Sequence, residues 1–523
     1  MLRFLLRKLN FRHRLNQNTG NGKNHTQVST IFPNVKKNIT FLRNTLGVSN
    51  DIVYREFTIG TIHKKNAALI YVDGLVTIAT VQQNILQPLM FDTRITRLDI
   101  NSINEIPEKI LSIGDVKEVC TMDEVLEGIL SGDTVLFLED SKTALVLSTR
   151  GWKARSIESP PTEEVVRGPR EGFTETLRTN TSLLRRKIKN PNLIFETITV
   201  GKRTKTDVCL VYIKGFTNPH LVEEIKRRLN RIDTDSILES GYIEQFIEDA
   251  PLSPFATMGN SEKPDIVAAR IMEGRAAIIV DGTPIVLTVP MLFIESFQSP
   301  EDYYSRPYYA SMVRSLRFLA FLISILGPAI YVALASYHHE LIPTQLVVTM
   351  AAASEGTPFP ALVEAVGMGI VFEILREAGI RLPRPVGQAI SIVGALVIGD
   401  AAVSAGLIGA PMVIVVAITA ISSFVVPPHS DSGSILRITF AIMAGVLGAF
   451  GIIIGLLGIL IYLASLRSFG VPYLSPLTPL SIADLKDTFI RFPLWAMFKR
   501  PKALNALDRE RQAFRLKPKP PSD

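Results

Sequence analysis

Carboxylates stand in and beside a stretch of the chain whose composition is otherwise that of membrane-embedded helix. Glu364, Glu373 and Asp400 fall within the apolar sequence from Pro358 to Gly409, and Glu355 lies just before it. Because an ionisable side chain is costly to hold at membrane depth, its presence indicates an ion pathway, a gate or a subunit contact. The chemistry that these residues suggest is the binding and passage of cations or protons.

Two of these acids lie in one expected helix. Glu364 and Glu373 are nine positions apart, about 900° of helical rotation, so they point to opposite faces and cannot both face one pore. Glu364 follows Pro360 in the first turn, where an acid also complements the helix dipole, so a pore role and a structural role stay equally open. Glu373 is expected in a charge cluster at the cytosolic rim, with Glu377, Arg376 and Arg381.

Asp400 has a different setting, because it stands among small residues in VIGDAAV. A carboxylate in the middle of an apolar segment needs a partner, a proton or water. We therefore expect Asp400 to be a buried polar contact or a water-facing site. The pore hypothesis places the pathway at residues 355 to 373, with Glu364 as the first candidate and Asp400 as the second.

Other kinds of site find no support in the sequence. No GxxxxGK[ST] and no strand-linked GxGxxG occurs, no spacing fits a metal site, and the seven histidines form no convincing Ser, His and Asp set. The two cysteines, Cys120 and Cys209, are expected to be ordinary core residues. We predict no enzyme activity, no cofactor, no metal and, since the basic residues flank apolar segments without a nucleic-acid motif, no nucleic-acid partner.

The elements that must position the carboxylates form an expected all-α polytopic membrane domain over residues 299–466. A run of about 19 apolar residues can cross a hydrocarbon core of roughly 30 Å. The apolar runs are Phe318–Ser336, Leu341–Ala353, Pro358–Ala378, Gln388–Leu407, Pro411–Val426 and Ile438–Leu463. The second is too short to cross, and the fifth is taken as re-entrant. Four crossings result, with six as the alternative.

The charge distribution sets the expected orientation. The first 50 residues carry nine Lys or Arg and no acid, and the tail from Arg467 has eleven basic residues against five acids. Positive charge beside membrane spans marks the cytosolic side, where anionic lipid attracts it. Both ends are therefore predicted in the cytosol.

Five glycines mark the last apolar run, which we interpret as one long span. If that helix is straight, they fall within an arc of roughly 140° and form a smooth face for close helix packing. A packing seam is favoured over a pore lining for these positions, which are Gly445, Gly448, Gly451, Gly455 and Gly458.

The front of the chain alternates β-like and helical runs and contains an internal repeat. EGILSGDTVLFLEDSKTALVL aligns with ARIMEGRAAIIVDGTPIVLTV at an offset of 142, and TIHKKNAALIYVDGLV aligns with KRTKTDVCLVYIKGFT at an offset of 141. The paired glycines are expected in turns that need a positive φ. The predicted fold is thus two similar α/β subdomains, 51–150 and 191–298, before the membrane domain, with a basic, partly disordered tail at 1–50, a connecting segment at 151–190 and a basic cytosolic tail at 467–523.

The connecting segment contains RGPREGF and then a basic run. It is either a solvated connecting helix or a hinge and docking surface that relays movement to the membrane part. Its partner in the second interpretation is the turn REAGIRLPRP. The candidate coupling residues are Arg167, Gly168, Pro169, Arg170, Glu171 and Gly172, with Arg381 and Arg384 in that turn.

Three long motifs resemble one family. EEVVRGPREGF, the stretch GTPFPALVEAVGMGIVFEILREAGIRLPRPVGQAISIVGALVIGDAAVSAGL and LASLRSFGVPYLSPLTP are similar to the A subunits of the GerA family of bacterial spore germinant receptors, over about residues 40 to 500. The resemblance implies a multi-pass protein of the inner spore membrane that oligomerises and conducts monovalent cations when germinant is sensed. It also implies two partners, a transporter-like B subunit and a lipoprotein C subunit.

Two alternatives stay open at this point. One is the accessory A-subunit paralogue of the SpoVAF type, which would amplify ion release outside a nutrient receptor. The other is a secondary transporter, which predicts an inverted repeat within residues 318–466 that the sequence does not show.

Overall fold

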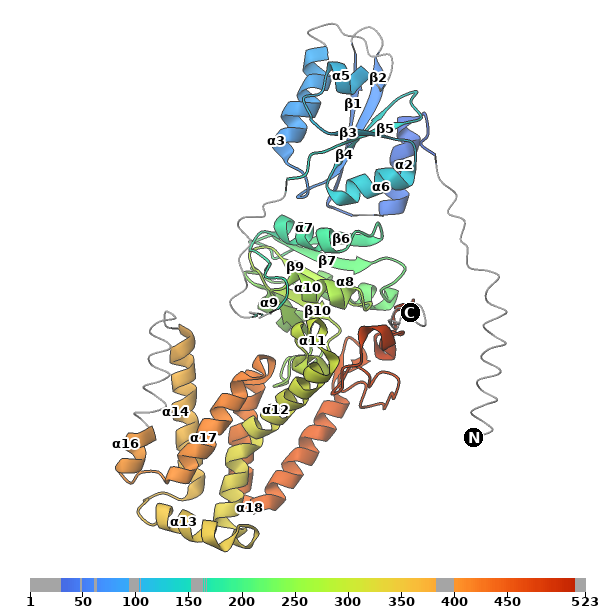
Figure 1. The fold of residues 1–523 in the computed structure, drawn as a ribbon. Helices are drawn as coiled ribbons and strands as arrows, with labels where there is room; N and C mark the ends of the chain where they lie inside the picture. Colours follow the sequence, from blue (N-terminus) through green and yellow to red (C-terminus); the bar gives the residue numbers. More distant parts are fainter. Residues whose placement is uncertain are drawn as a thin grey trace, which may run out of the picture. The chain divides into compact units, whose positions relative to one another are not determined.

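The computed structural model describes residues 30–47, 49–60, 64–93, 103, 105–151, 163, 165, 167–381 and 399–512. The chain divides into two compact units (Figure 1). The first consists of Met1–Ala154 and Thr181–Phe195, and the second of Arg155–Asn180 and Glu196–Asp523. Both expected sheets are thus present, but the second sheet belongs to the same unit as the apolar helices.

The first unit is built on a five-stranded antiparallel sheet of order β1-β2-β4-β5-β3. Alternate residues face opposite sides, as the two-residue strand period requires: Ala68 and Ile70 join the core under α2 and α6, whereas Ala67 and Leu69 join the core on the other side. Its elements are α2 (Val35–Leu46), β1 (Ile52–Ile59), β2 (Lys65–Val72), α3 (Ile78–Val81), the π-helical turns η2 (Gln82–Leu86) and η3 (Pro88–Asp92), α5 (Glu105–Lys109), β3 (Val116–Val119), α6 (Met122–Ser131), β4 (Thr134–Leu138) and β5 (Ala144–Leu147).

The end of the expected N-terminal tail is part of this unit. α2 begins at Val35 with Asn34 as its N-cap and buries Val35, Ile39, Leu42 and Leu46. The expectation of a partly disordered tail at 1–50 is therefore wrong for its described residues, which begin at 30. Its polar composition hid a helix whose apolar residues recur at a spacing of three to four.

The second sheet repeats the first, with the order β6-β7-β9-β10-β8. β6 (Leu193–Val200) and β7 (Thr206–Ile213) each begin 141 residues after β1 and β2, and β9 (Ala276–Val280) and β10 (Val286–Val289) begin 142 residues after β4 and β5. The paired glycines behave alike, with φ of 92° at Gly132 and 97° at Gly274. The remaining elements are α7 (Leu177–Lys187), α8 (Pro219–Arg231), α9 (Ser240–Ile247), β8 (Gly259–Ser261) and α10 (Pro264–Ile271).

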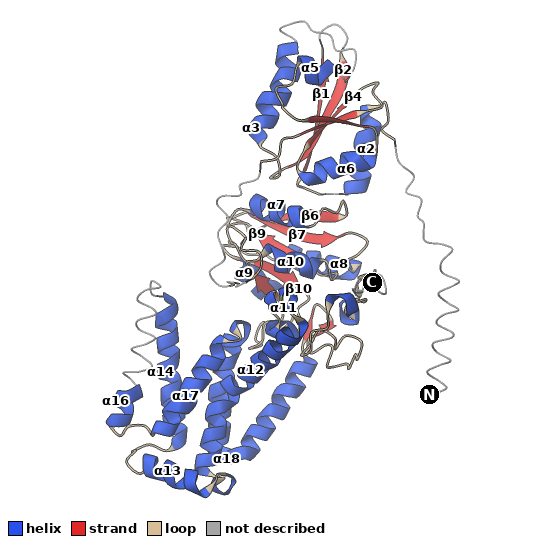
Figure 2. Cartoon of the chain, in the orientation of Figure 1, coloured by secondary structure: helices blue, strands red, loops and turns tan. Residues whose placement is uncertain are grey.

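A helical part follows the second sheet (Figure 2). Among the described residues, the two stretches that are long and apolar enough to cross a membrane by length and composition are Pro307–Ser336 and Pro427–Ser465. The elements are the 3-10 turn η4 (Phe293–Phe297), α11 (Glu301–Tyr304), α12 (Pro307–Ser336), η5 (His339–Leu341), α13 (Thr344–Ser354), α14 (Ala361–Arg381), α16 (Gly399–Ser404), α17 (Ala410–Phe424), η7 (Pro427–His429) and α18 (Ser430–Ser465).

α18 is not one straight helix. Gly448 has φ 61° and ψ −143°, which breaks the helix into two legs. Gly455 faces Phe440 of the first leg, and a Cβ there would lie 2.6 Å from that ring. Both ends meet Phe255 of the second sheet's subdomain, through His429 at 5.9 Å and Tyr462 at 6.4 Å between ring centroids. The legs are therefore antiparallel.

This hairpin overturns two expectations. The predictions of one long span at Ile438–Leu463 and of one continuous glycine face are wrong, because Gly448 forms a turn within it. Of the other glycines, Gly445, Gly451 and Gly455 make close contacts, and Gly458 faces open space. The tip of the hairpin meets the end of α12, where the Tyr337 hydroxyl donates to the Gly445 carbonyl at 2.7 Å. We call this the outer end of the bundle, and the end beside Phe255 the inner end.

α14 and α17 run in the same direction. The amide of Gly409, the N-cap of α17, lies at the first turn of α14, and Phe424 near the end of α17 packs on Phe372 at 6.1 Å. The interpretation of Pro411–Val426 as a re-entrant segment is therefore not supported. The expected span Gln388–Leu407 falls mainly outside the described residues.

The C-terminal segment returns to the second sheet's subdomain. The Ser468 hydroxyl donates to the Thr257 carbonyl at 2.6 Å, the Phe293 amide donates to the Tyr473 carbonyl at 2.9 Å, and the Leu507 amide donates to the Phe216 carbonyl at 3.0 Å. Its short elements are β11 (Arg467–Ser468), β12 (Val471–Pro472) and the 3-10 turns η8 (Leu494–Ala496) and η9 (Lys502–Leu504). The described part of the tail is thus folded onto the protein.

Candidate functional site

The first intramembrane candidate, Glu364, lies inside the bundle near its outer end. It occupies the first turn of α14, is 5% exposed, and accepts a long hydrogen bond of 3.5 Å from the Gly409 amide. A carboxylate at this point complements the positive N-terminal ends of both α14 and α17. Within one chain, Glu364 therefore joins two helices and does not face outward.

Glu373 lies near the inner end and links α14 to α18. Its carboxylate accepts from Arg437 at 2.7 Å and from the Ser434 hydroxyl at 2.7 Å, and pairs with Arg376 at 2.8 Å. Arg437 is 5% exposed and also lies 5.3 Å from the centroid of the Phe372 ring. The buried arginine thus has a carboxylate, a hydroxyl and an aromatic face around it.

The remaining expected polar residues are placed at the periphery. Glu355 is the C-cap of α13 and is exposed. Asp400 is in the first turn of the short helix α16 and is also exposed, so a single chain does not bury it and the water-facing alternative stays open. Arg381 makes an exposed pair with Glu377 at 2.6 Å, and Arg384 lies outside the described residues.

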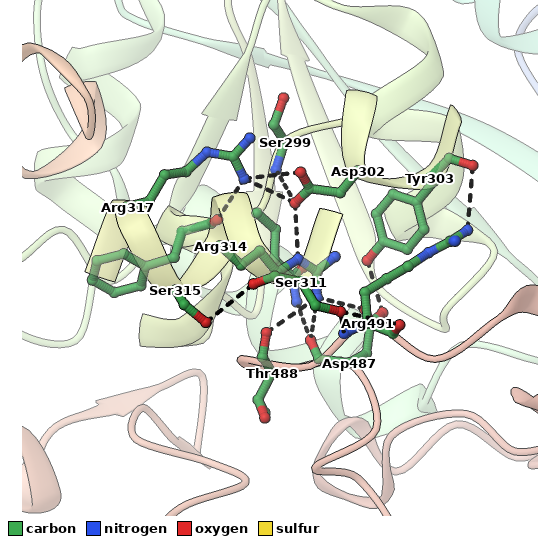
Figure 3. A network of polar contacts seen from close by, with 12 residues as sticks. Ser299, Asp302, Tyr303, Ser311, Arg314, Ser315, Arg317, Asp487, Thr488 and Arg491 are labelled. Atoms are coloured by element: carbon green, nitrogen blue, oxygen red, sulfur yellow. Dashed lines mark hydrogen bonds and ion pairs between the residues drawn. The ribbon is translucent and has the colours of Figure 1, made fainter. Parts of the chain in front are cut away.

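A network of buried ion pairs and hydrogen bonds lies where α12 enters the bundle, at the inner end (Figure 3). Arg314 is 1% exposed; it donates to Asp302 at 2.8 Å and to Asp487 at 2.7 Å. Arg317 pairs with Asp302 at 2.9 Å, and Arg314 donates further to the Thr488 carbonyl at 3.1 Å. One arginine therefore ties the start of α12 to α11 and to the C-terminal segment.

Two further side chains close this network around Asp487. Tyr303 donates from its hydroxyl to Asp487 at 2.7 Å, and Arg491 donates to the Tyr303 carbonyl at 3.3 Å. Burial, followed by the charge of Asp487, raises the pKa of Tyr303 well above its usual value. Tyr303 consequently remains a hydrogen-bond donor throughout the physiological pH range.

Local sequence explains why the network forms at this point. Arg306 is extended, Pro307 occupies the first turn of α12, and the short helix α11 ends just before them. Asp302 in α11 is thereby turned back toward Arg314 and Arg317, which lie on one side of α12 three residues apart. Arg314 needs such acids, because an unpaired charge at this depth would be strongly destabilising.

The RGPREGF motif docks beside the same helix. The Arg167 amide donates to Glu301 at 3.4 Å, and Lys263 donates from Nζ to the Pro169 carbonyl at 3.0 Å. Gly168 has φ 148°, and a Cβ there would lie 2.8 Å from the Tyr304 ring. The motif is therefore fixed to α11 and to the second sheet's subdomain, which suits a docking surface.

Arg185 of the basic run lies in the first unit and is completely buried. It forms a bidentate pair with Asp51, in which Nε donates to Oδ2 at 3.0 Å and Nη2 donates to Oδ1 at 3.0 Å, and its guanidinium stands 4.7 Å from the Phe195 ring centroid. A solvated connecting helix does not describe this residue. Its burial shows that part of the run is a structural anchor.

The arginine networks were not predicted from the sequence, although the sequence does show that one of these arginines needs an acidic partner. Arg437 is one of four basic residues between 318 and 466, and a charge in so apolar a segment needs an acidic partner. The spacing of the sequence does not show which carboxylate that partner is. Asp487 is 173 residues from Arg314, and no local pattern connects them.

The two cysteines differ in burial: Cys209 is buried as expected, whereas Cys120 is exposed. The described residues contain no group of three His, Cys, Asp or Glu placed for a metal.

Comparisons with known proteins agree on one family. The model of the Bacillus/Clostridium GerA spore germination protein matches residues 40–503. Spore germination protein KA of Bacillus subtilis (strain 168) is 48% identical over 94% of this chain and 90% of its own length, and spore germination protein GerLA of Bacillus cereus is 40% identical over 89% and 95%. The crystal structure of the N-terminal domain of the A subunit of the Bacillus megaterium spore germinant receptor GerK3 is 39% identical, covers 51% of this chain and 98% of that one, and has a TM-score of 0.42.

Proposed function

Because the chain belongs to the GerA family of spore germination proteins, we propose that it is the A subunit of a nutrient germinant receptor. In this proposal it resides in the inner spore membrane and acts with a transporter-like B subunit and a lipoprotein C subunit. Copies of the chain oligomerise and form a pathway for monovalent cations, which opens when germinant is sensed. The match of the family model over residues 40–503 carries the proposal.

The bundle supports a multi-pass arrangement with six crossings. α12 runs from the inner to the outer end, α14 and α17 both run inward, and the two legs of α18 run outward and back. α14 ends and α17 begins at opposite ends of the bundle, and the expected span Gln388–Leu407, which lies mainly outside the described residues, is proposed as the outward crossing between them. An even number of crossings puts the second sheet and the C-terminal segment on one side, as the basic flanks also require.

The pathway is proposed at residues 355–373, together with Asp400. Glu355 and Asp400 are exposed on a single chain, and Gly367 and Gly369 of α14 face open space. Rings of carboxylates favour cations, and a symmetric oligomer places one such helix from each subunit around an axis. Glu364 can contribute to selectivity, although its buried position also supports a role in holding α17 against α14.

The receptor proposal is tested in spores of the parent bacterium. Spores that lack this gene should fail to release potassium on addition of the germinant, and a plasmid copy should restore release. The accessory SpoVAF-type alternative predicts slower release with every germinant, whereas a receptor subunit affects only its own germinant. Normal release with all germinants would contradict both.

A further inference from the structure

We propose that residues 480–495, here called the C-terminal foot, bind the anionic lipid surface beside the inner end of α12. The inference rests on the proposed membrane location of the helices. It concerns a different property from ion conduction, namely how the C-terminal segment is seated on the head groups of the inner leaflet.

The foot is fixed at the depth of the lipid head groups. Phe489 packs edge-on against Phe318, the first residue of the expected span, with 5.0 Å between ring centroids. The Arg491 amide donates to Ser311 at 3.0 Å, and Asp487 holds Arg314 at 2.7 Å. Along α12, Arg314 and Ser311 precede Phe318 by about 6 and 10 Å. The head-group layer is about 5–8 Å thick on each side of the hydrocarbon core, so the foot spans this layer.

The foot exposes large apolar side chains at this depth. A soluble surface rarely gathers so many in one short segment. The exposed fractions are 68% for Leu480, 78% for Ile482, 59% for Ile490, 41% for Phe492, 47% for Leu494 and 36% for Trp495. The adjoining start of α12 continues the apolar and aromatic surface with Tyr308, Tyr309, Met312, Leu316 and Leu319, all exposed. Trp and Tyr are enriched at this level of membrane proteins because their rings suit the boundary.

The foot carries two acids and two basic residues, and the basic excess that favours an anionic surface lies beside it. Asp487 is neutralised by Arg314, and Asp484 accepts from the Ser481 hydroxyl at 2.8 Å and from the Lys502 amide at 3.1 Å. Lys499 is exposed just beyond Trp495, and the tail from Arg467 has eleven basic residues against five acids. Basic residues beside an apolar face are the composition of segments that lie on anionic membranes.

The test uses Trp495 as a probe in the full chain. Trp152→Phe removes the one other tryptophan, and the variant is reconstituted into phosphatidylglycerol vesicles. Lipids brominated high on the acyl chain should quench most of the Trp495 fluorescence, whereas iodide on both sides of the membrane should quench little. Strong quenching by iodide with none by brominated lipid would overturn the inference, because the foot would then face water or a protein partner.

A second variant separates the foot from the rest of the protein. The double variant Leu480→Ser with Ile482→Ser should make the foot accessible to chymotrypsin in phosphatidylglycerol vesicles. The control double variant, Leu238→Ser with Phe246→Ser, alters exposed apolar residues of the α9 region and should leave the foot protected. Equal protection in both double variants would contradict the proposal. Carbonate extraction and potassium flux on the same vesicles report the membrane location and conduction independently, so quenching retains the foot whether or not a current is recorded.

Discussion

The sharpest prediction concerns the Arg314 network, through the substitution Asp302→Asn. The side chains of Asp302 and Arg314 are 3% and 1% exposed, and their charged groups lie 2.8 Å apart. Asp302 also pairs with Arg317. Removing one partner of a buried ion pair costs about 3–5 kcal/mol, because the remaining charge stays buried and unpaired. Asp487 is 26% exposed, so water can partly replace it, and Asp487→Asn should cost about 1.5 kcal/mol.

Chemical unfolding of the full chain in detergent measures both losses. The matched control is Glu377→Gln, which removes a pair whose side chains are 57% and 77% exposed and should cost less than about 0.5 kcal/mol. In the double variant Asp302→Asn with Arg314→Met, the loss should be smaller than the sum of the single losses by about 1 kcal/mol or more. An Asp302→Asn loss no larger than that of Glu377→Gln would refute the reasoning.

Three further predictions follow from other sites. Gly448→Ala should destabilise the bundle by about 1–3 kcal/mol, because φ is 61° and Tyr337 and His338 lie 3.1 Å from the new Cβ, whereas Gly458→Ala in open space should be neutral. Burial, with the charges of Glu248 and Glu239, raises the pKa of Glu244 to about 7. Ionisation of Glu244 therefore lowers the stability of the folded state as the pH rises from about 4.5 through 7, and Glu244→Gln should raise the Tm at pH 8 but not at pH 4.5. Arg185→Lys should lose the bidentate contact with Asp51 and lower the Tm more than Arg178→Lys, and an equal effect would contradict the anchoring role.

The repeat in the front of the chain was predictable because local physics encodes it. Gly132 and Gly274 both need a positive φ, and the strands beside them keep the same spacing, so alignment alone located the corresponding strands. The break in α18 was not predictable in the same way. Five glycines occur in that run, and no local feature shows that Gly448 is the one that turns the chain.

In the candidate site, too, the local features were predictable from the sequence and the long-range contacts were not. The position of Glu364 in a first turn follows from Pro360, and its burial between α14 and α17 depends on contacts 45 residues away. Arg437 had to pair with an acid, but the choice of Glu373 was made by the packing of α14 on α18. The docking of the C-terminal segment on Arg314 is a long-range contact that composition described only as a basic tail.

The central claim is that the chain forms part of a cation pathway, and conductance tests it most directly. The purified chain, with the proposed B and C subunits, is reconstituted into a planar bilayer under a potassium chloride gradient, and germinant is added. The account predicts a germinant-dependent current selective for potassium over chloride, with reduced selectivity in Glu355→Gln. The absence of any current with all partners and germinant present would contradict it.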